Sequence, residues 1–131
     1  MHRKGNIMNK IIFTENVPKP VGPYSQAMEV NKMIFCSGQI ALDAASDEIE
    51  GTEIYTQTEK VCNNIAKLLE AANLSFGNVV KTTCYLVNMG DFQKFNEVYA
   101  KYFVSKPARS CVAVKTLPKN VLVEVEVVAV R

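Results

Sequence analysis

The residues best suited to chemistry lie near the C-terminal end of the chain, in the segments PARSCV and VEVE. Arg109 and Cys111 are two residues apart and so share one face of an expected strand, as do Glu124 and Glu126 of the next one. A guanidinium offers parallel donors that match a carboxylate or phosphate, and a nearby glutamate can hold or deprotonate a water. Since the register is not fixed by sequence, the cluster is either a site of this kind or a cross-strand ion pair.

Periodic apolar residues predict the elements that must position this cluster. Residues 54–73 and 91–103 repeat apolar side chains every three or four positions, as amphipathic helices do, and we expect Asn73 to end the first as a left-handed cap. Asp91 is the expected N-cap of the second helix, whose aromatic stripe we assign to the core. Strands are expected at residues 10–13, 24–30, 33–37, 79–88, 108–114 and 121–130.

The expected fold is an α+β sandwich, with a mostly antiparallel sheet of about six strands and both helices on one face. We expect residues 24–37 to form a hairpin that turns at Asn31 and Lys32, and the last two strands to pair as an antiparallel hairpin. One face of the last strand is wholly aliphatic, whereas the other carries Glu124 and Glu126 among apolar residues. An uncovered face that is half apolar predicts association with other subunits.

Composition limits the class of protein. The chain has 131 residues, of which 48% are apolar, and a formal net charge of +2. We therefore expect one domain at residues 10–131 after a flexible extension at residues 1–9, no membrane span, and no nucleic-acid partner, since the chain has no basic stripe. The four cysteines lack CxxC spacing, which argues against a zinc site. A chain of this length and apolar content does not need disulfides, so we expect reduced thiols in the cytoplasm. A short basic leader for an organelle is the less favoured reading of the first residues.

Several segments together give the chain a recognisable signature, namely GPYSQA, FCSGQI, GDFQKFNEVY, PARSCV and LPKNVLVEVEVVAV. In this order they resemble the YjgF/RidA family of reactive-intermediate deaminases over residues 10–131. The resemblance implies a chorismate-mutase-like α+β fold and a homotrimer, whose sheets form a central barrel with clefts between subunits. It implies hydrolysis of 2-imino acids, such as 2-iminobutyrate and 2-iminopropanoate, to 2-oxo acids and ammonia. It implies no cofactor and no metal.

The resemblance also implies roles for individual residues. Arg109 would grip the substrate carboxylate, and Glu124 would position the attacking water. Glu126 we expect in a structural ion pair. The residues that the resemblance places around the substrate are Tyr24, Ser37, Gly38, Asn96 and Cys111.

Each of these residues also has a plainer reading. Tyr24 can simply pack on its proline-rich loop, and Ser37 and Gly38 can simply end a strand. Asn96 can be a buried hydrogen-bonding residue, and Cys111 a small buried hydrophobe. Two other activities stay open for the whole chain, an endoribonuclease or translation inhibitor of the L-PSP type and a chaperone-like binding module.

Overall fold

The structure is a computed structural model that describes residues 9–131. The flexible extension expected at residues 1–9 therefore lies almost entirely outside the described residues. Within them the chain forms one six-stranded sheet and two α-helices. The helices are α1 (Ile54–Ala71) and α2 (Phe92–Tyr102). The strands are β1 (Lys10–Ile12), β2 (Ala27–Val30), β3 (Met33–Cys36), β4 (Val79–Leu86), β5 (Ala108–Ala113) and β6 (Val123–Val130).

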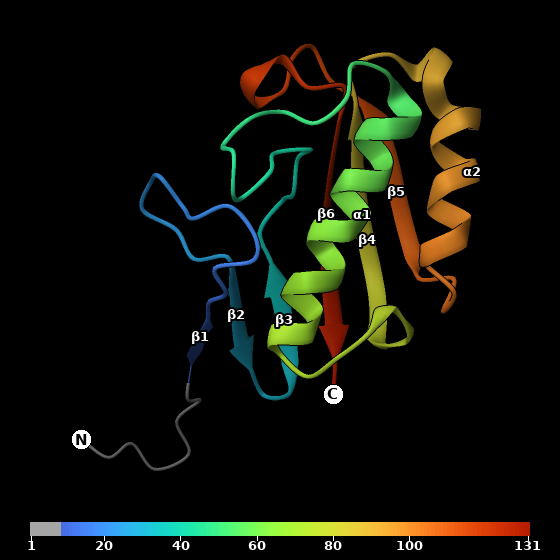
Figure 1. The fold of residues 1–131 in the computed structure, drawn as a ribbon. Helices are drawn as coiled ribbons and strands as arrows, with labels where there is room; N and C mark the ends of the chain where they lie inside the picture. The colour runs from blue at the N-terminus through green and yellow to red at the C-terminus, as the bar shows by residue number, and fades with distance from the viewer. Residues whose placement is uncertain (1–8) are drawn as a thin grey trace, which may run out of the picture.

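The strand order is β1-β2-β3-β6-β4-β5, and every neighbouring pair is antiparallel except β4 and β5. Both helices lie on one face of this sheet (Figure 1), which confirms the expected α+β fold. The β2–β3 hairpin is also confirmed, because Asn31 and Lys32 have φ angles of 51° and 66°. Two successive positive φ angles give the turn type whose twist matches a two-residue hairpin.

The antiparallel hairpin expected between the last two strands is wrong. β6 lies between β3 and β4, whereas β5 pairs with β4 in parallel at the edge of the sheet. Parallel pairing needs a crossover, and α2 supplies it between β4 and β5. Burial gives the physical reason, because alternate residues of β6 are buried, while four of the six residues of β5 are exposed. The apolar strand therefore takes a central position, and the more polar one takes the edge.

Helix α1 covers the middle of the sheet with a stripe that includes Val61, Ile65 and Leu68, all fully buried. It ends as expected, since Asn73 has a φ of 61° and follows the C-cap residue. Two backbone bonds of 2.9 Å close this end, from Leu74 N–H to the Leu69 carbonyl and from Asn73 N–H to the Glu70 carbonyl. This is the hydrogen-bond pattern of a Schellman motif.

Helix α2 carries the aromatic stripe, and its core assignment is confirmed for the buried residues Phe95, Tyr99 and Phe103. Asp91 occupies the N-cap position as expected but makes no side-chain capping bond. The Asn88 side chain instead accepts from Gly90 N–H at 2.8 Å, one short turn earlier. Helix α2 is therefore held mainly by its aromatic face.

The face of the sheet opposite the helices is partly apolar, as the alternation in β6 predicts. Phe35 of β3 is 46% exposed and Val112 of β5 is 44% exposed on the chain alone. Cys36, Cys62 and Cys84 are buried in the core, and all four thiols are free. None of the helices formed by residues 9–131 is long and apolar enough to span a membrane.

Candidate active site

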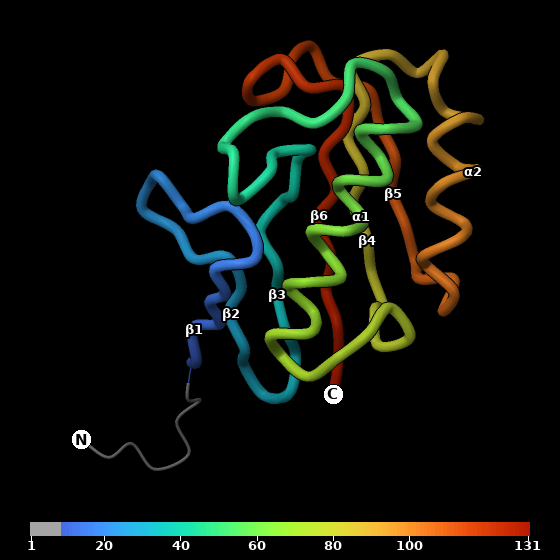
Figure 2. Tube along the Cα trace, in the orientation of Figure 1, coloured from blue at the N-terminus to red at the C-terminus, as the bar shows by residue number. Residues whose placement is uncertain are grey.

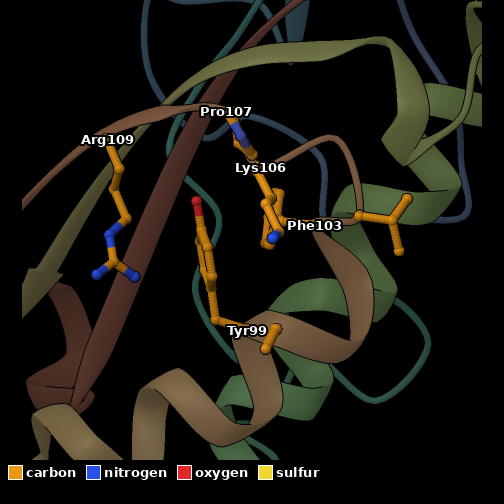
Figure 3. Close-up of a pocket in the computed structure, with 7 residues that line it drawn as sticks. Tyr99, Phe103, Lys106, Pro107 and Arg109 are labelled. Atoms are coloured by element: carbon orange, nitrogen blue, oxygen red, sulfur yellow. The ribbon is translucent and has the colours of Figure 1, made fainter.

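The guanidinium of Arg109 lies between strand β5 and helix α2, on the helix side of the sheet (Figure 3). Its carbon is 4.7 Å from the centre of the Tyr99 ring and 5.5 Å from that of Phe92. Its Nη1 donates to Oδ1 of Asn96 at 2.7 Å. Among residues 9–131 no carboxylate lies within 4.0 Å of it. The alternative of a cross-strand ion pair is therefore wrong, because the strand expected to supply the glutamate is not its neighbour.

The three side chains around this guanidinium come from one face of α2. Phe92, Asn96 and Tyr99 are spaced four and three residues apart, so a helix places them in one row. Asn96 was expected to line a pocket, and it instead holds Arg109. Sequence reasoning missed the contact of Phe92 and Tyr99 with Arg109 because it assigned the whole stripe to the core. The single amide inside an aromatic stripe was the available signal.

A cavity of about 490 Å³ opens beside Arg109, between the end of α2 and the start of β5. It combines mainly apolar walls with two cationic residues, Lys106 and Arg109. Such a cavity can accept a small ligand with an anionic group. Its other lining residues are Tyr99, Ala100, Phe103, Val104 and Pro107.

Glu124 points away from Arg109 within one chain. Arg109 is in register with Thr82 of β4, and Thr82 with the buried Val127 of β6. Glu124 lies three residues from Val127, on the opposite face, which puts the two residues about 10 Å apart across the strands and about 10 Å along them. They also line separate cavities. A site that uses both side chains therefore needs two copies of the chain.

The second cavity, of about 430 Å³, is lined by Glu124 together with residues from the loops at 14–26 and 37–53, which lie beside each other (Figure 2). Tyr24, Ser37 and Gly38, three of the five residues that the resemblance placed around the substrate, line it. Tyr24 is 55% exposed, so its ring is available for contacts with a ligand or another subunit. The Ser37 hydroxyl donates to the Ser25 carbonyl at 2.6 Å, which leaves its oxygen as an acceptor.

Two glutamines that sequence reasoning left without a role also line this second cavity. The buried Gln26 side chain accepts from Thr14 N–H at 2.8 Å and donates to the Thr14 and Pro18 carbonyls at 3.0 Å. It therefore holds the proline-rich loop that carries Tyr24. Gln39 is buried too, and both residues belong to motifs that were visible in the sequence, GPYSQA and FCSGQI.

Gly38 leaves room for the Glu124 carboxylate in its present position. A Cβ at this glycine would lie 2.0 Å from Glu124 Oε2, so a side chain here would displace the carboxylate. The close approach is fixed by two backbone bonds, from Gln39 N–H to the Val125 carbonyl at 2.8 Å and from Val125 N–H to the Gln39 carbonyl at 3.1 Å. The Glu124 carboxylate thus lies directly beside the backbone of Gly38.

Burial raises the pKa of Glu124, and the charge of Glu126 adds to this effect. Both causes disfavour the ionised carboxylate, so Glu124 takes up a proton more readily than a free glutamate. Glu126 was expected in an ion pair, and among residues 9–131 it has none. It instead accepts from the Tyr85 hydroxyl at 3.1 Å.

Cys111 was expected to line the substrate cleft, and the structure places it in neither cavity. It is partly buried on β5, in register with Cys84 of β4. Burial raises the pKa of its thiol, which argues against a reactive thiolate. Residues 9–131 also contain no group of three or more His, Cys, Asp or Glu residues that could hold a metal ion.

Comparison with known proteins identifies the class to which this fold and these cavities belong. The family model described as endoribonuclease L-PSP matches residues 14–131. A RutC family protein of Pyrococcus horikoshii is 51% identical over 125 residues, which cover 95% of this chain and 99% of that protein. The chain belongs to the endoribonuclease L-PSP family, also known as YjgF/RidA, as its motifs led us to expect.

Solved structures agree with this assignment. YyfA of Yersinia pestis, a protein of the conserved Rid family, superposes with a TM-score of 0.92 at 38% identity, covering 95% of this chain and 100% of that one. TdcF of E. coli, solved with bound serine, superposes with a TM-score of 0.88 at 38% identity, covering 93% and 98% of the two chains.

The contact between Gly38 and Glu124 predicts a coupled pair of substitutions. Gly38→Ala should lower the free energy of unfolding by about 1 kcal/mol or less, because the new methyl group must displace the Glu124 carboxylate. Glu124→Ala removes the obstructing carboxylate, so the double variant should recover most of this loss in a denaturation cycle. Gly77→Ala is the control, since its nearest neighbour, Ser75 Oγ, is 3.8 Å away. Additive effects of Gly38→Ala and Glu124→Ala would contradict the contact.

The raised pKa of Glu124 predicts a stability difference that depends on pH. The folded state binds this proton more tightly than the unfolded state, so the wild type loses stability as pH rises through the folded pKa. The difference in unfolding free energy between Glu124→Gln and the wild type should therefore increase in favour of the variant as the pH rises above the usual glutamate pKa of about 4. Glu29→Gln should show the opposite trend, because the hydrogen bond from Arg131 lowers the pKa of Glu29. Parallel trends for the two variants would contradict this assignment.

Proposed function

We propose that this protein hydrolyses 2-imino acids to 2-oxo acids and ammonia. One observation carries the proposal: Arg109 is held by two aromatic rings and an amide, without a carboxylate partner among residues 9–131, beside a cavity of small-molecule size. A guanidinium that is fixed but not neutralised is suited to bind a planar carboxylate. The serine bound to TdcF, a relative at 38% identity, is a small molecule with such a carboxylate.

The site we propose lies between subunits of a homotrimer. Arg109 of one subunit would bind the carboxylate, and Glu124 of the next subunit would face the adjacent carbon. Two features of the chain support this arrangement, the separation of Arg109 and Glu124 on opposite faces of one sheet and the partly apolar face beside Glu124. The Tyr24 ring and the Ser37 hydroxyl would line the shared cleft from the side of Glu124.

The reaction begins with the substrate held by its carboxylate, which fixes the neighbouring C=N carbon next to a water. The imine nitrogen is protonated, and the water oxygen bonds to the C=N carbon as the π electrons of this bond move to nitrogen. Glu124 accepts the proton that the water loses and then gives it to the nitrogen. The hydroxyl oxygen forms the carbonyl bond as the C–N bond breaks, and ammonia leaves with the hydroxyl proton as ammonium.

The environment of Glu124 suits both proton transfers. A carboxyl whose pKa is raised is a stronger base than an ordinary glutamate, and more of it carries a proton near neutral pH, so it can accept a proton and then return it. A protonated imine is already a strong electrophile, so the residues described here can account for the reaction.

The family name also suggests cleavage of RNA, but the geometry gives that activity less support. The chain has one histidine, His2, which lies outside the described residues, and a net charge of only +2. Phe95 is fully buried, and the Tyr99 ring is packed between Phe103 and Arg109, so neither ring is presented for base stacking. An RNase assay on the same preparations serves as a control for the deaminase test below.

The proposed deaminase is tested by adding the purified protein to a threonine dehydratase with threonine and following 2-oxobutyrate. The wild type should accelerate release of 2-oxobutyrate, and Arg109→Ala should lower kcat/KM by about 10- to 100-fold, the value of a hydrogen-bonded charge pair. Arg109→Lys should recover little of the lost kcat/KM, because an ammonium lacks the two parallel donors of a planar guanidinium.

Arg131→Lys is the matched control, since that arginine pairs with Glu29 at 2.7 Å and lies outside both cavities. It should keep wild-type activity. No acceleration by the wild type, or an Arg109→Ala variant as active as its parent, would overturn the proposed function.

A further inference from the structure

We propose that Thr82 and Tyr99 are positioning residues for Arg109, and that the buried hydrogen bond between their hydroxyl groups sets the affinity for the substrate carboxylate. The inference rests on the function proposed above. Neither residue belongs to the candidate site predicted from the sequence, and Thr82 lines neither cavity.

The Tyr99 ring is packed between two groups. Arg109 lies on one side of it and Phe103 on the other, as Figure 3 shows. The rings of Tyr99 and Phe103 are stacked with centres 4.2 Å apart and an angle of 21° between their planes, and Phe95 lies 5.5 Å away. Phe103 therefore fixes one face of the Tyr99 ring, and the other face makes a cation–π contact with the Arg109 guanidinium.

Core packing alone does not explain why residue 99 is a tyrosine, because its hydroxyl group is buried and hydrogen-bonded. Tyr99 is 9% exposed and Thr82 is fully buried, and their oxygens are 2.8 Å apart. A phenylalanine would fill the same core without bringing a polar group that costs free energy to bury. The bond ties the far end of the ring to β4 and so restricts its sliding and tilting.

The position of Thr82 makes this bond specific to Arg109. Thr82 is the register partner of Arg109 on the neighbouring strand, and both side chains face α2. The same pair of strand positions thus fixes the backbone of Arg109 and, through Thr82, the position of the Tyr99 ring that contacts its guanidinium. Asn96, one helical turn before Tyr99, fixes the guanidinium from a second direction at 2.7 Å. A cation held in this way needs little reordering when a carboxylate binds.

The inference is tested with Tyr99→Phe and Thr82→Val, which remove the bond but keep the ring and the volume. Binding of 2-oxobutyrate is measured by calorimetry, and KM and kcat are taken from the dehydratase assay. Each variant should raise the Kd of 2-oxobutyrate and KM by about 3- to 10-fold, the value of one hydrogen bond, with kcat changed less than about twofold. The double variant should be no worse than either single one, since all three lack the same bond.

Tyr102→Phe is the matched control, because this tyrosine of the same helix binds Glu59 rather than Thr82. It should leave Kd unchanged. Tyr99→Phe and Thr82→Val variants that are less stable but keep the wild-type Kd would overturn the inference, and if Arg109→Ala still loses binding the proposed function would stand. A wild type that neither binds 2-oxobutyrate nor accelerates its release would overturn both.

Discussion

The candidate site depends on one interaction, the contact of the Arg109 guanidinium with the Tyr99 ring and the Asn96 amide in place of a carboxylate. An ion pair would have satisfied this cation within the chain, and a freely exposed arginine would have cost entropy to order. The uncharged Tyr99 ring and Asn96 amide form a neutral setting that avoids both outcomes, since they fix the guanidinium and leave its charge available to a ligand. Helix α2, the β4–β5 register and the buried Thr82 all contribute to this neutral setting of the guanidinium.

A second constraint separates the two halves of the proposed chemistry. Side chains on successive residues of a strand point to opposite faces, so the sheet that orients Arg109 toward α2 orients Glu124 away from it. The Glu124 carboxylate lies beside Gly38 at the other cavity, in space that a Cβ at this position would take. One chain therefore places Arg109 and Glu124 at separate cavities, and the proposed site can join them only across two subunits. This division gives a physical reason for the association that the exposed apolar face suggests.

Local patterns predicted most of the fold. The stripe of α1, its end at Asn73 and the turn at Asn31 and Lys32 follow from rules that act within a few residues. The pairing of β5 was wrong because adjacency in sequence favours a hairpin, whereas the choice of central strand depends on how the whole sheet is buried. The same limit applies to the site. The sequence indicated Arg109 and Glu124 because of their chemical character. It did not indicate Phe92 and Tyr99, because only their distance from Arg109 distinguishes them from ordinary core residues.

The claim that Arg109 and Glu124 act together across a subunit boundary is tested most directly by mixing two inactive variants. Arg109→Ala and Glu124→Gln chains with different affinity tags are co-expressed, and assemblies that carry both tags are purified. Each mixed trimer would contain one site with both residues intact, so we predict about one third of the wild-type deaminase activity. Mixed assemblies as inactive as either parent would contradict the account.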